Sequence, residues 1–399
     1  MASAAQLSRA SDGCYGMSRG NKLLVAMTFN PRRHSDRSRG ICDRSVRRTG
    51  ILVADSDYRA LCSFYCIHES LMPSSQRNLS DLGSLFASTR CLVLGGGGFI
   101  GTNLSNALAG FGAQVHAYGR RQTWPSSLAP GVRWTTADLA DQTSLTAAVE
   151  GADFIFHLAN SSTPAGANSD PVADVTDNLV TTLNFLEICR VRPVRRIVFI
   201  SSGGTVYGAA SQNPIPETAT TDPISAYAIH KLTIEKYFAL YRHLYGLDYL
   251  ILRVANPYGP MQIARKNQGV VAALMKRALA GDPIEIWGSG DVVRDFIYID
   301  DVVRALLMAA MHPGPSRLFN VGSGAGLSIN TVIDDVERVA GRGPLRRLYM
   351  PSRAVDVPVN VLDISRIRDE MGWTPEIEWL DGLRRTMNWM KGSEARRPE

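Results

Sequence analysis

The feature that most constrains the fold of this chain is a glycine-rich turn at residues 95–101. It follows the apolar residues 91–94, which predict a buried strand. Apolar side chains then recur at helical spacing, at Ile100, Leu104 and Leu108. A turn of this kind between a strand and a helix presents backbone N–H groups and a helix N-terminus to phosphate groups. The pattern therefore predicts a dinucleotide site.

Further apolar strands alternate with helical patterns after this turn. We expect strands at residues 113–118, 132–136, 154–158, 196–200 and 249–253, and helices near residues 179–189 and 227–245. Such alternation predicts a parallel sheet with helices on both faces. The expected fold class is therefore α/β, with a doubly wound sheet of the Rossmann type.

The pattern becomes mixed after Pro257, which predicts a smaller α/β lobe at the C-terminal end. We expect residues 90–257 to form the dinucleotide-binding domain, completed by parts of residues 291–325. Residues 258–290 and 326–392 would then form the substrate-binding lobe.

Residues 1–85 differ from the rest because they are rich in Arg and Ser and show no sustained periodicity. We expect this basic extension to be disordered. Residues 1–90 hold 13 Lys and Arg against seven Asp and Glu, whereas residues 91–399 hold 30 of each, so residues 1–90 carry the whole net charge of +6. Two further interpretations stay open, a transit peptide and a translation start at Met72.

Charge, hydropathy and cysteine content exclude several classes of protein. The balanced charge of residues 91–399 gives no basic surface for nucleic acid, and no run of 18 apolar residues predicts a membrane-spanning helix. Cys91 and Cys189 suggest neither a metal pair nor a disulfide framework. Cys62 and Cys66 lack a His pair at zinc-finger spacing. We therefore expect no metal site and a reducing, cytoplasmic setting.

Three glycines of the turn have separate expected tasks. Gly95 permits the tight turn, Gly98 lets N–H groups approach a pyrophosphate, and Gly101 lets the helix pack against the strand.

The choice between NAD and NADP depends on the end of the second strand. NAD-binding folds usually carry an acid there, which binds the ribose hydroxyls. This chain has Arg120 and Arg121 instead, and either could attract the extra phosphate of NADP or stack on the adenine. Asp138 follows the third strand and could bind the adenine amino group or cap a helix. The residues leave both cofactors open.

Tyr227 and Lys231 are four residues apart, so on a helix they share one face. We expect the ammonium of Lys231 and a bound nicotinamide cation to stabilise the Tyr227 phenolate and lower its pKa. The pair follows residues 201–208, with the sequence SSGGTVYG, at the end of a strand where ligands bind in such sheets. Tyr227 is therefore predicted as a proton acceptor, with Lys231 as its electrostatic support and a ribose ligand.

Five ordered motifs resemble those of extended short-chain dehydrogenase/reductases, and specifically of nucleotide-sugar epimerases of the UDP-glucose 4-epimerase type. They are the glycine turn, residues 201–208, the Tyr227-x-x-x-Lys231 pair, residues 253–260 (RVANPYGP) and residues 293–301 (VRDFIYIDD). The resemblance covers residues 90 to about 390. It implies a bound NAD that oxidises the sugar at C4 while the tyrosine removes the hydroxyl proton. The 4-keto sugar then turns over and receives the hydride on its other face.

The resemblance also implies further binding residues. His157 to Ala159 would border the nicotinamide. Together with the residues already named, the expected cofactor-binding set is Gly95, Gly98, Phe99, Ile100, Gly101, Arg120, Asp138, Leu139, Leu158, Ala159, Asn178, Ser201, Tyr227 and Lys231. Asn256, Arg294 and Arg353 would hold the uridine diphosphate, because the planar fork of arginine suits pyrophosphate.

The chain departs from the family pattern where the catalytic hydroxyl is expected. The family's Ser or Thr aligns with Gly203, so Ser202 or Thr205 would have to donate the hydrogen bond to the sugar oxygen. Dehydratase relatives carry an Asp-Glu pair where this chain has Gly204 and Thr205. Without that acid and base, elimination of water is not expected.

The sequence therefore predicts an NAD-dependent epimerase that inverts C4 of a UDP-sugar of the UDP-glucose/UDP-galactose type, for polysaccharide precursor supply. By analogy we expect a homodimer through the helices around Leu179 and Tyr237. Two alternatives stay open. Arg120 and Arg121 motivate an NADP-dependent nucleotide-sugar reductase, and a non-catalytic dinucleotide sensor is the alternative of another class. The sequence does not identify the sugar or the nucleotide.

Overall fold

The computed structural model describes residues 79–122, 125–263, 269–352 and 357–394, all within the unit formed by residues 67–399. The expectations for residues 1–78 lie outside these ranges. Residues 79–86 correct the predicted extent of the extension, because they form helix α2 (Leu79–Phe86). Leu82 and Phe86 are buried in the core, and this apolar anchoring explains why the helix forms beside a polar segment.

A seven-stranded sheet is the centre of the described fold. Its order is β10-β6-β5-β4-β1-β2-β3, and every neighbouring pair is parallel. The strands are β1 (Arg90–Leu94), β2 (Gln114–Gly119), β3 (Arg133–Thr136), β4 (Phe154–His157), β5 (Arg196–Ser202), β6 (Tyr249–Val254) and β10 (Leu318–Val321). The predicted α/β fold class is therefore confirmed, with strand boundaries close to those expected.

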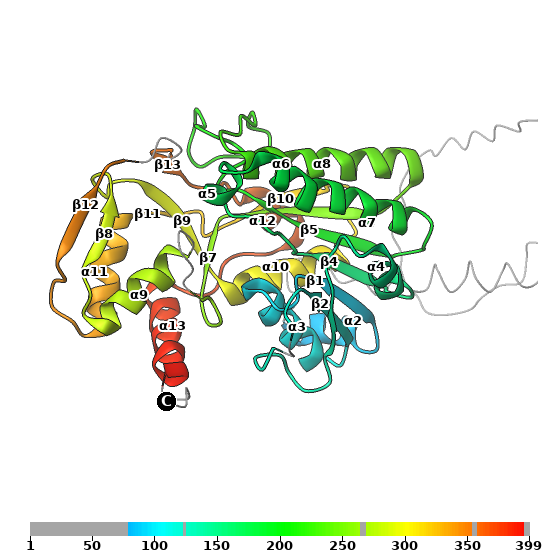
Figure 1. Ribbon diagram of the computed structural model, residues 1–399, viewed down its shortest axis with the longest axis horizontal. Coiled ribbons are helices and arrows are strands. Elements are labelled where there is room, and N and C mark those ends of the chain that lie inside the picture. Colours follow the sequence, from blue (N-terminus) through cyan, green and yellow to red (C-terminus); the bar gives the residue numbers. More distant parts are fainter. Residues whose placement is uncertain (1–78, 123–124, 264–268, 353–356, 395–399) are drawn as a thin grey trace, which may run out of the picture. The chain divides into compact units, whose positions relative to one another are not determined.

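Helices cover both faces of this sheet (Figure 1). One face packs against α2, α3 (Phe99–Gly110) and α10 (Ile299–Met311), and the other against α4 (Gln142–Val149), α7 (Thr181–Arg190) and α8 (Ala226–Tyr245). The side chains of strand β1 are buried on both faces of the sheet. Cys91 and Val93 pack in the core on one face, and Leu92 and Leu94 pack in the core on the other. A strand buried on both faces is continuously apolar, as this one is.

Between β4 and α7 the chain forms short helical pieces. They are α5 (Pro164–Ala167), α6 (Pro171–Asp174) and the π-helical turn η2 (Val175–Val180), which runs directly into α7. The helix predicted near residues 179–189 is therefore preceded by a widened turn that periodicity did not indicate.

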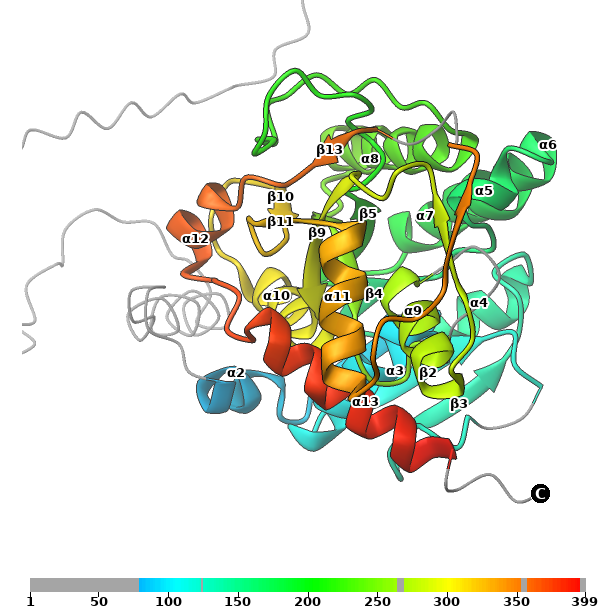
Figure 2. The same ribbon diagram turned by 90° about the vertical axis from the view of Figure 1, so that its left-hand side faces the viewer.

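The remaining strands form two smaller sheets. Strands β7 (Asn256–Tyr258), β9 (Val293–Tyr298), β11 (Gly326–Ser328) and β13 (Val359–Asn360) form one sheet, and β8 (Ile284–Trp287) pairs with β12 (Arg347–Met350). Figure 2 shows α11 (Ile329–Ala340) between α9 (Val270–Ala280) and α13 (Trp379–Glu394). Helix α12 (Ser365–Met371) instead packs against β10, so this part of residues 326–392 lies beside the main sheet.

Candidate active site

The glycine turn joins β1 to α3 at the carboxyl end of the main sheet. Gly95 has a φ of +83°, in the left-handed region, and its N–H and that of Gly96 both donate to Tyr118 O, at 2.9 and 3.1 Å. A Cβ on Gly101 would overlap Gly95 O, so only glycine lets α3 start this close to the turn. Helix α3 begins at Phe99 with no side chain capping its N-terminus. Its free N–H groups suit a phosphate.

A cavity of about 340 Å³ opens beside this turn. Eight of the expected cofactor residues line it: Gly95, Gly98, Arg120, Asp138, Leu139, Leu158, Ala159 and Asn178. Six others, Phe99, Ile100, Gly101, Ser201, Tyr227 and Lys231, are not among its lining residues. The lining also includes side chains that the sequence did not single out, chiefly Tyr118, Trp134, Asn160, Ser161, Asp177 and Thr182.

The end of the cavity at β2 and β3 carries the two arginines expected there. Arg120 NH1 lies 3.8 Å from Asp138 Oδ2, with both side chains at least half exposed. Asp138 Oδ1 also accepts from Ala140 N at 2.9 Å, so this aspartate does cap a turn. Trp134 donates from Nε1 to Thr136 Oγ1 at 2.9 Å. No signal marked Trp134, because a single aromatic residue on a short strand is ordinary core composition.

Tyr227 and Lys231 lie on the first turns of α8, with Ser202 at the end of β5 facing Tyr227. The Ser202 side chain hydrogen-bonds to Tyr227 and lowers its pKa, but burial and the Asp174 carboxylate outweigh this and raise it to about 12. Without a bound cofactor, Lys231 therefore does not produce the expected lowering of the Tyr227 pKa. The Lys231 ammonium donates to Ile200 O at 3.1 Å and lies 5.9 Å from the centre of the Tyr227 ring. Burial lowers the pKa of Lys231 to about 8.

The Ser201 side chain is occupied elsewhere. It is buried and donates to Glu235 Oε1 at 2.5 Å, and Glu235 forms a buried ion pair with Arg253, whose NH2 lies 2.6 Å from Oε2. The Ser201 hydroxyl therefore stabilises the β5, α8 and β6 junction and is not directed at the cavity. Adjacent serines at a strand end point to opposite faces, which separates the roles of Ser201 and Ser202.

Gly203 has no room for a side chain. A Cβ there would lie 2.5 Å from Leu362 Cδ1 and 3.0 Å from Arg253 O. Thr205 Oγ1 is buried and has no hydrogen-bond partner among the described residues. Ser202 is consequently the hydroxyl that the structure brings to Tyr227, and Thr205 is not shown in contact with it.

Two of the three expected diphosphate ligands, Asn256 and Arg294, lie on neighbouring strands of the four-stranded sheet. Asn256 begins β7 and donates from Nδ2 to Asp295 O at 2.8 Å, and Arg294 lies on β9, which pairs with β7. Arg294 NH1 donates to Val357 O at 2.7 Å. Arg353 lies outside the described residues.

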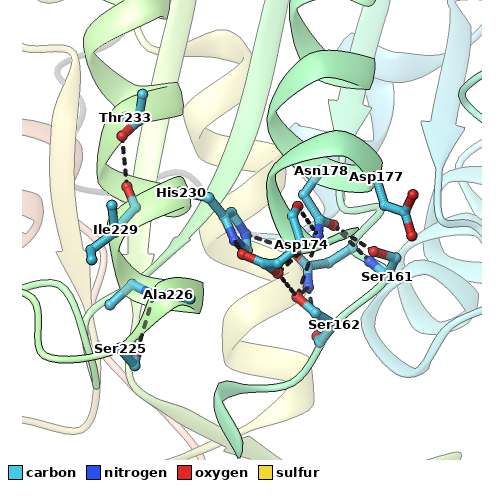
Figure 3. A network of polar contacts seen from close by, with 12 residues as sticks. Ser161, Ser162, Asp174, Asp177, Asn178, Ser225, Ala226, Ile229, His230 and Thr233 are labelled. Atoms are coloured by element: carbon cyan, nitrogen blue, oxygen red, sulfur yellow. Dashed lines mark hydrogen bonds and ion pairs between the residues drawn. The ribbon is translucent and has the colours of Figure 1, made fainter. Parts of the chain in front are cut away.

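The sequence did not indicate a buried polar network that includes Asp174, Asn178 and His230 (Figure 3). The His230 ring contacts the ring of Tyr227. His230 Nδ1 lies 2.6 Å from Asp174 Oδ2, and His230 Nε2 lies 3.1 Å from Asn160 Oδ1. Asp174 also accepts hydrogen bonds from Ser162 Oγ and, at 3.1 Å, from Asn178 Nδ2. The network joins three segments that are far apart in the chain, around residues 160–162, 174–178 and 230, so no single local spacing indicates it.

Within residues 79–394 as described, no three His, Cys, Asp or Glu side chains are grouped so that they could hold a metal ion. None of the helices in the same ranges is both long and apolar enough to cross a membrane.

Comparison with known proteins agrees with this geometry. The model of the NAD dependent epimerase/dehydratase family matches residues 91–322. A putative UDP-glucose 4-epimerase of Methanocaldococcus jannaschii is 33% identical over 306 residues, which are 76% of this chain and 98% of that protein. The crystal structure of UDP-glucose 4-epimerase from Thermotoga maritima with UDP-glucose has a TM-score of 0.73 and 32% identity, and covers 77% of this chain and 100% of its own.

The Thermus thermophilus UDP-glucose 4-epimerase complex with NAD has a TM-score of 0.72 and 31% identity, over 76% of this chain and 100% of its own. The resemblance predicted from the ordered motifs is thereby confirmed. This chain belongs to the NAD-dependent epimerase/dehydratase family.

Proposed function

We propose that this protein is an NAD-dependent epimerase that inverts C4 of a UDP-sugar of the UDP-glucose/UDP-galactose type. The observation that carries the proposal is the contact of Ser202 with Tyr227 at the end of β5, with Lys231 one helical turn away. The relatives named UDP-glucose 4-epimerase support the same activity.

The dinucleotide cavity fits NAD by its chemistry. A side chain at Gly101 would overlap the backbone of the glycine turn, so α3 can begin close to the turn only with glycine there. The uncapped N-terminus of α3 offers N–H donors for a pyrophosphate. We propose that Asp138 and Arg120 bind the adenosine end, while Leu158, Ala159 and Asn178 border the nicotinamide.

The proposed reaction needs a group that accepts and returns the proton of the sugar hydroxyl. NAD, when bound, would supply the hydride acceptor and a positive charge that favours the phenolate form of Tyr227. As the phenolate, Tyr227 would accept the C4 hydroxyl proton while the carbon gives up its hydride, and would return the proton to the sugar oxygen when the hydride is restored on the opposite face. Ser202 hydrogen-bonds to the phenol and holds the sugar oxygen in line with it. The hydroxyl of Ser202 thus replaces the one missing at Gly203.

Lys231 supports this step through its charge. With a pKa of about 8 the amine is mostly protonated at neutral pH, and it hydrogen-bonds to Ile200 O beneath the active-site edge of β5. We propose that the same ammonium binds the nicotinamide ribose. Asn256 and Arg294, with Arg353, are proposed to hold the uridine diphosphate.

We further propose a homodimer formed by the outer faces of α7 and α8. Ile229, Leu240 and Leu244 are exposed along one face of α8, and Val175 and Val180 are exposed on η2. Light scattering after gel filtration tests this, since a monomer mass would contradict it. A cytoplasmic setting is proposed because Cys91 and Cys189 are both buried free thiols.

The activity is tested with purified protein and UDP-galactose, without added nicotinamide, by following the sugar signals by NMR. Interconversion with UDP-glucose is expected. A nucleotide-sugar reductase is the second candidate, because Arg120 and Arg121 line the cavity and could bind the NADP phosphate. Stoichiometric NADPH consumption would support that candidate, and NAD binding with no change in either sugar would support a sensor.

Tyr227→Phe is the decisive variant. It removes the proton acceptor and keeps the ring, so we expect kcat to fall at least about 100-fold while bound NAD per chain is retained. Ser202→Ala is the companion variant and should lower kcat less. Near-normal turnover of Tyr227→Phe would contradict the proposed mechanism.

A further inference from the structure

The buried pair of Asp174 and His230 has no role in the reaction as described above. Asp174 is 3% exposed and His230 is 1% exposed, and their nearest polar atoms are 2.6 Å apart. Asp174 ends α6, and His230 lies on α8 between Tyr227 and Lys231 in sequence. Burial of a carboxylate and an imidazole is costly unless each is hydrogen-bonded, so this contact is required once both residues are present.

His230 contacts an oxygen atom at each ring nitrogen. Nδ1 faces Asp174 Oδ2, and Nε2 faces Asn160 Oδ1 at 3.1 Å. The orientation of the Asn160 amide is set by its Nδ2, which donates to Ser162 O at 2.7 Å. Only an imidazole with two N–H groups satisfies both oxygens. The Asp174 carboxylate favours that form, whereas burial and the Lys231 ammonium lower the pKa of His230.

The pair connects three segments that meet at the active site. Asn160 belongs to the loop after β4 and lines the dinucleotide cavity. Asp174 also accepts from Asn178, which lines the same cavity from η2. The His230 ring lies edge-on to the Tyr227 ring, with 5.2 Å between their centres. The cavity wall and the helix that carries the proton acceptor are therefore joined through the two contacts of His230, with Asn160 and with Asp174.

The widened turn η2 depends on the same aspartate. Asn178 Nδ2 donates to the backbone O of Asp174 at 2.9 Å as well as to its carboxylate. Asn178 Oδ1 accepts from Ser161 N at 2.8 Å, which ties the turn to the loop after β4 (Figure 3). π-Helical turns inside helices are rare and occur frequently at functional sites.

We propose that Asp174 and His230 are a positioning pair for the epimerase site, which fixes the loop after β4 against α8 and so aligns the cofactor cavity with Tyr227. This proposal rests on the proposed function. Neither residue is a catalytic residue, because they act through Asn160, Asn178 and the placement of the Tyr227 ring.

A charge effect accompanies this positioning and separates it from a merely structural contact. The Asp174 carboxylate raises the pKa of both Tyr227 and Lys231. The other titratable groups that face this centre are Glu235 of α8, which raises the pKa of Lys231, and His157 of β4, whose own pKa is lowered by Lys231. Removal of the Asp174 charge alone should therefore shift the pH dependence of the reaction.

The experiment uses the full chain and four variants. Asp174→Asn removes the charge and keeps the shape. His230→Asn keeps a donor near the Nδ1 position, towards Asp174, whereas His230→Gln keeps one near the Nε2 position, towards Asn160. His243→Gln is the matched control, because His243 is an exposed histidine on the same helix. Circular dichroism and thermal unfolding check that each variant folds.

The first readout is NAD retained per purified chain, measured after denaturation. We expect Asp174→Asn and His230→Gln to retain less NAD than the wild type, by about tenfold at limiting NAD, with His230→Asn closer to the wild type. His243→Gln should match the wild type. Equal retention by all five proteins would overturn the proposal, even if the wild type shows no epimerase activity.

The second readout is the steady-state rate with the UDP-sugar at saturating NAD. We expect kcat to fall about tenfold in Asp174→Asn and His230→Gln, with KM for the sugar nucleotide changed less than about twofold. The acid limb of the kcat profile should move to lower pH in Asp174→Asn, because the phenol loses a neighbouring negative charge. An unmoved limb, or equal losses in His230→Asn and His230→Gln, would overturn the proposal. An inactive wild type with normal NAD binding would count against the proposed function instead.

Discussion

Adding one methyl group at Gly203 tests the reason why the family hydroxyl is missing from this position. The new Cβ would lie 2.5 Å from Leu362 Cδ1, about 1 Å inside ordinary van der Waals contact. Leu362 is fully buried, and the new Cβ would also lie 3.0 Å from Arg253 O. Overpacking of this kind costs ~1–3 kcal/mol, and we expect Gly203→Ala to lower the free energy of unfolding by that amount.

The neighbouring glycine provides a matched control. A Cβ on Gly204 would meet nothing closer than Asn256 Oδ1 at 3.8 Å, and Gly204 does not have a positive φ. Gly204→Ala should therefore be neutral or stabilise the fold by up to ~1 kcal/mol through the unfolded chain. Both substitutions add one methyl group to a glycine. The difference between their free energies of unfolding therefore measures the effect of the contact with Leu362.

The assay is urea unfolding followed by tryptophan fluorescence, without added NAD. Leu362→Ala alone should cost ~2–5 kcal/mol because it leaves a cavity. The double variant Gly203→Ala/Leu362→Ala should cost less than the sum of its single variants, because the new methyl enters the space that Leu362 vacates. Strictly additive effects, or a Gly203→Ala protein as stable as Gly204→Ala, would refute the reasoning.

Three further predictions concern the pH dependence of stability and the cofactor site. Burial lowers the pKa of His157 to about 3, so the unfolded chain binds more protons below its ordinary pKa of 6.5 and stability is lost as the pH falls. The stability advantage of the wild type over His157→Gln should shrink by ~2 kcal/mol between pH 6.5 and about pH 4.5 in urea unfolding, and parallel curves would contradict this. Gly101→Ala places a methyl group against Gly95 O and should weaken NAD binding by about tenfold or more in calorimetry. An unchanged Kd would contradict the role of the glycine turn in cofactor binding. Lys231→Ala removes a charged donor worth ~1.5–3 kcal/mol and should lower both NAD retention and kcat at least about tenfold, and normal NAD retention would argue against the ribose role.

The sequence predicts the parts of the fold that depend on the spacing of apolar residues and glycines within a short stretch of chain. Strand β1, the glycine turn and α3 occupy consecutive residues, and their apolar spacing and glycines are visible without any tertiary contact. Helix α2 was missed because it has only eight residues and follows a long polar segment. Its two buried side chains become informative only once the sheet they pack on is known.

The site residues that the sequence did not indicate depend on contacts between distant segments. His230 and Asp174 are 56 residues apart, and Leu362 fills the space beside Gly203 from near the end of the chain. The pKa of Tyr227 was expected to be lowered by Lys231, but helix geometry alone does not show that the amine donates to Ile200 O. Burial, which no motif displays, then determines the direction of the shift.

The segment around β13 has a consequence for the order in which the protein matures. Asn360 Nδ2 donates to Gly203 O at 3.1 Å, and Ile215 N donates to Val361 O at 2.8 Å. Residues 360 and 361 therefore stabilise the loop that follows Ser202. They are synthesised about 150 residues after that loop. A nascent chain can assemble the first strands and the glycine turn early, but its proton-transfer centre stays incomplete until residues 360 and 361 have been synthesised.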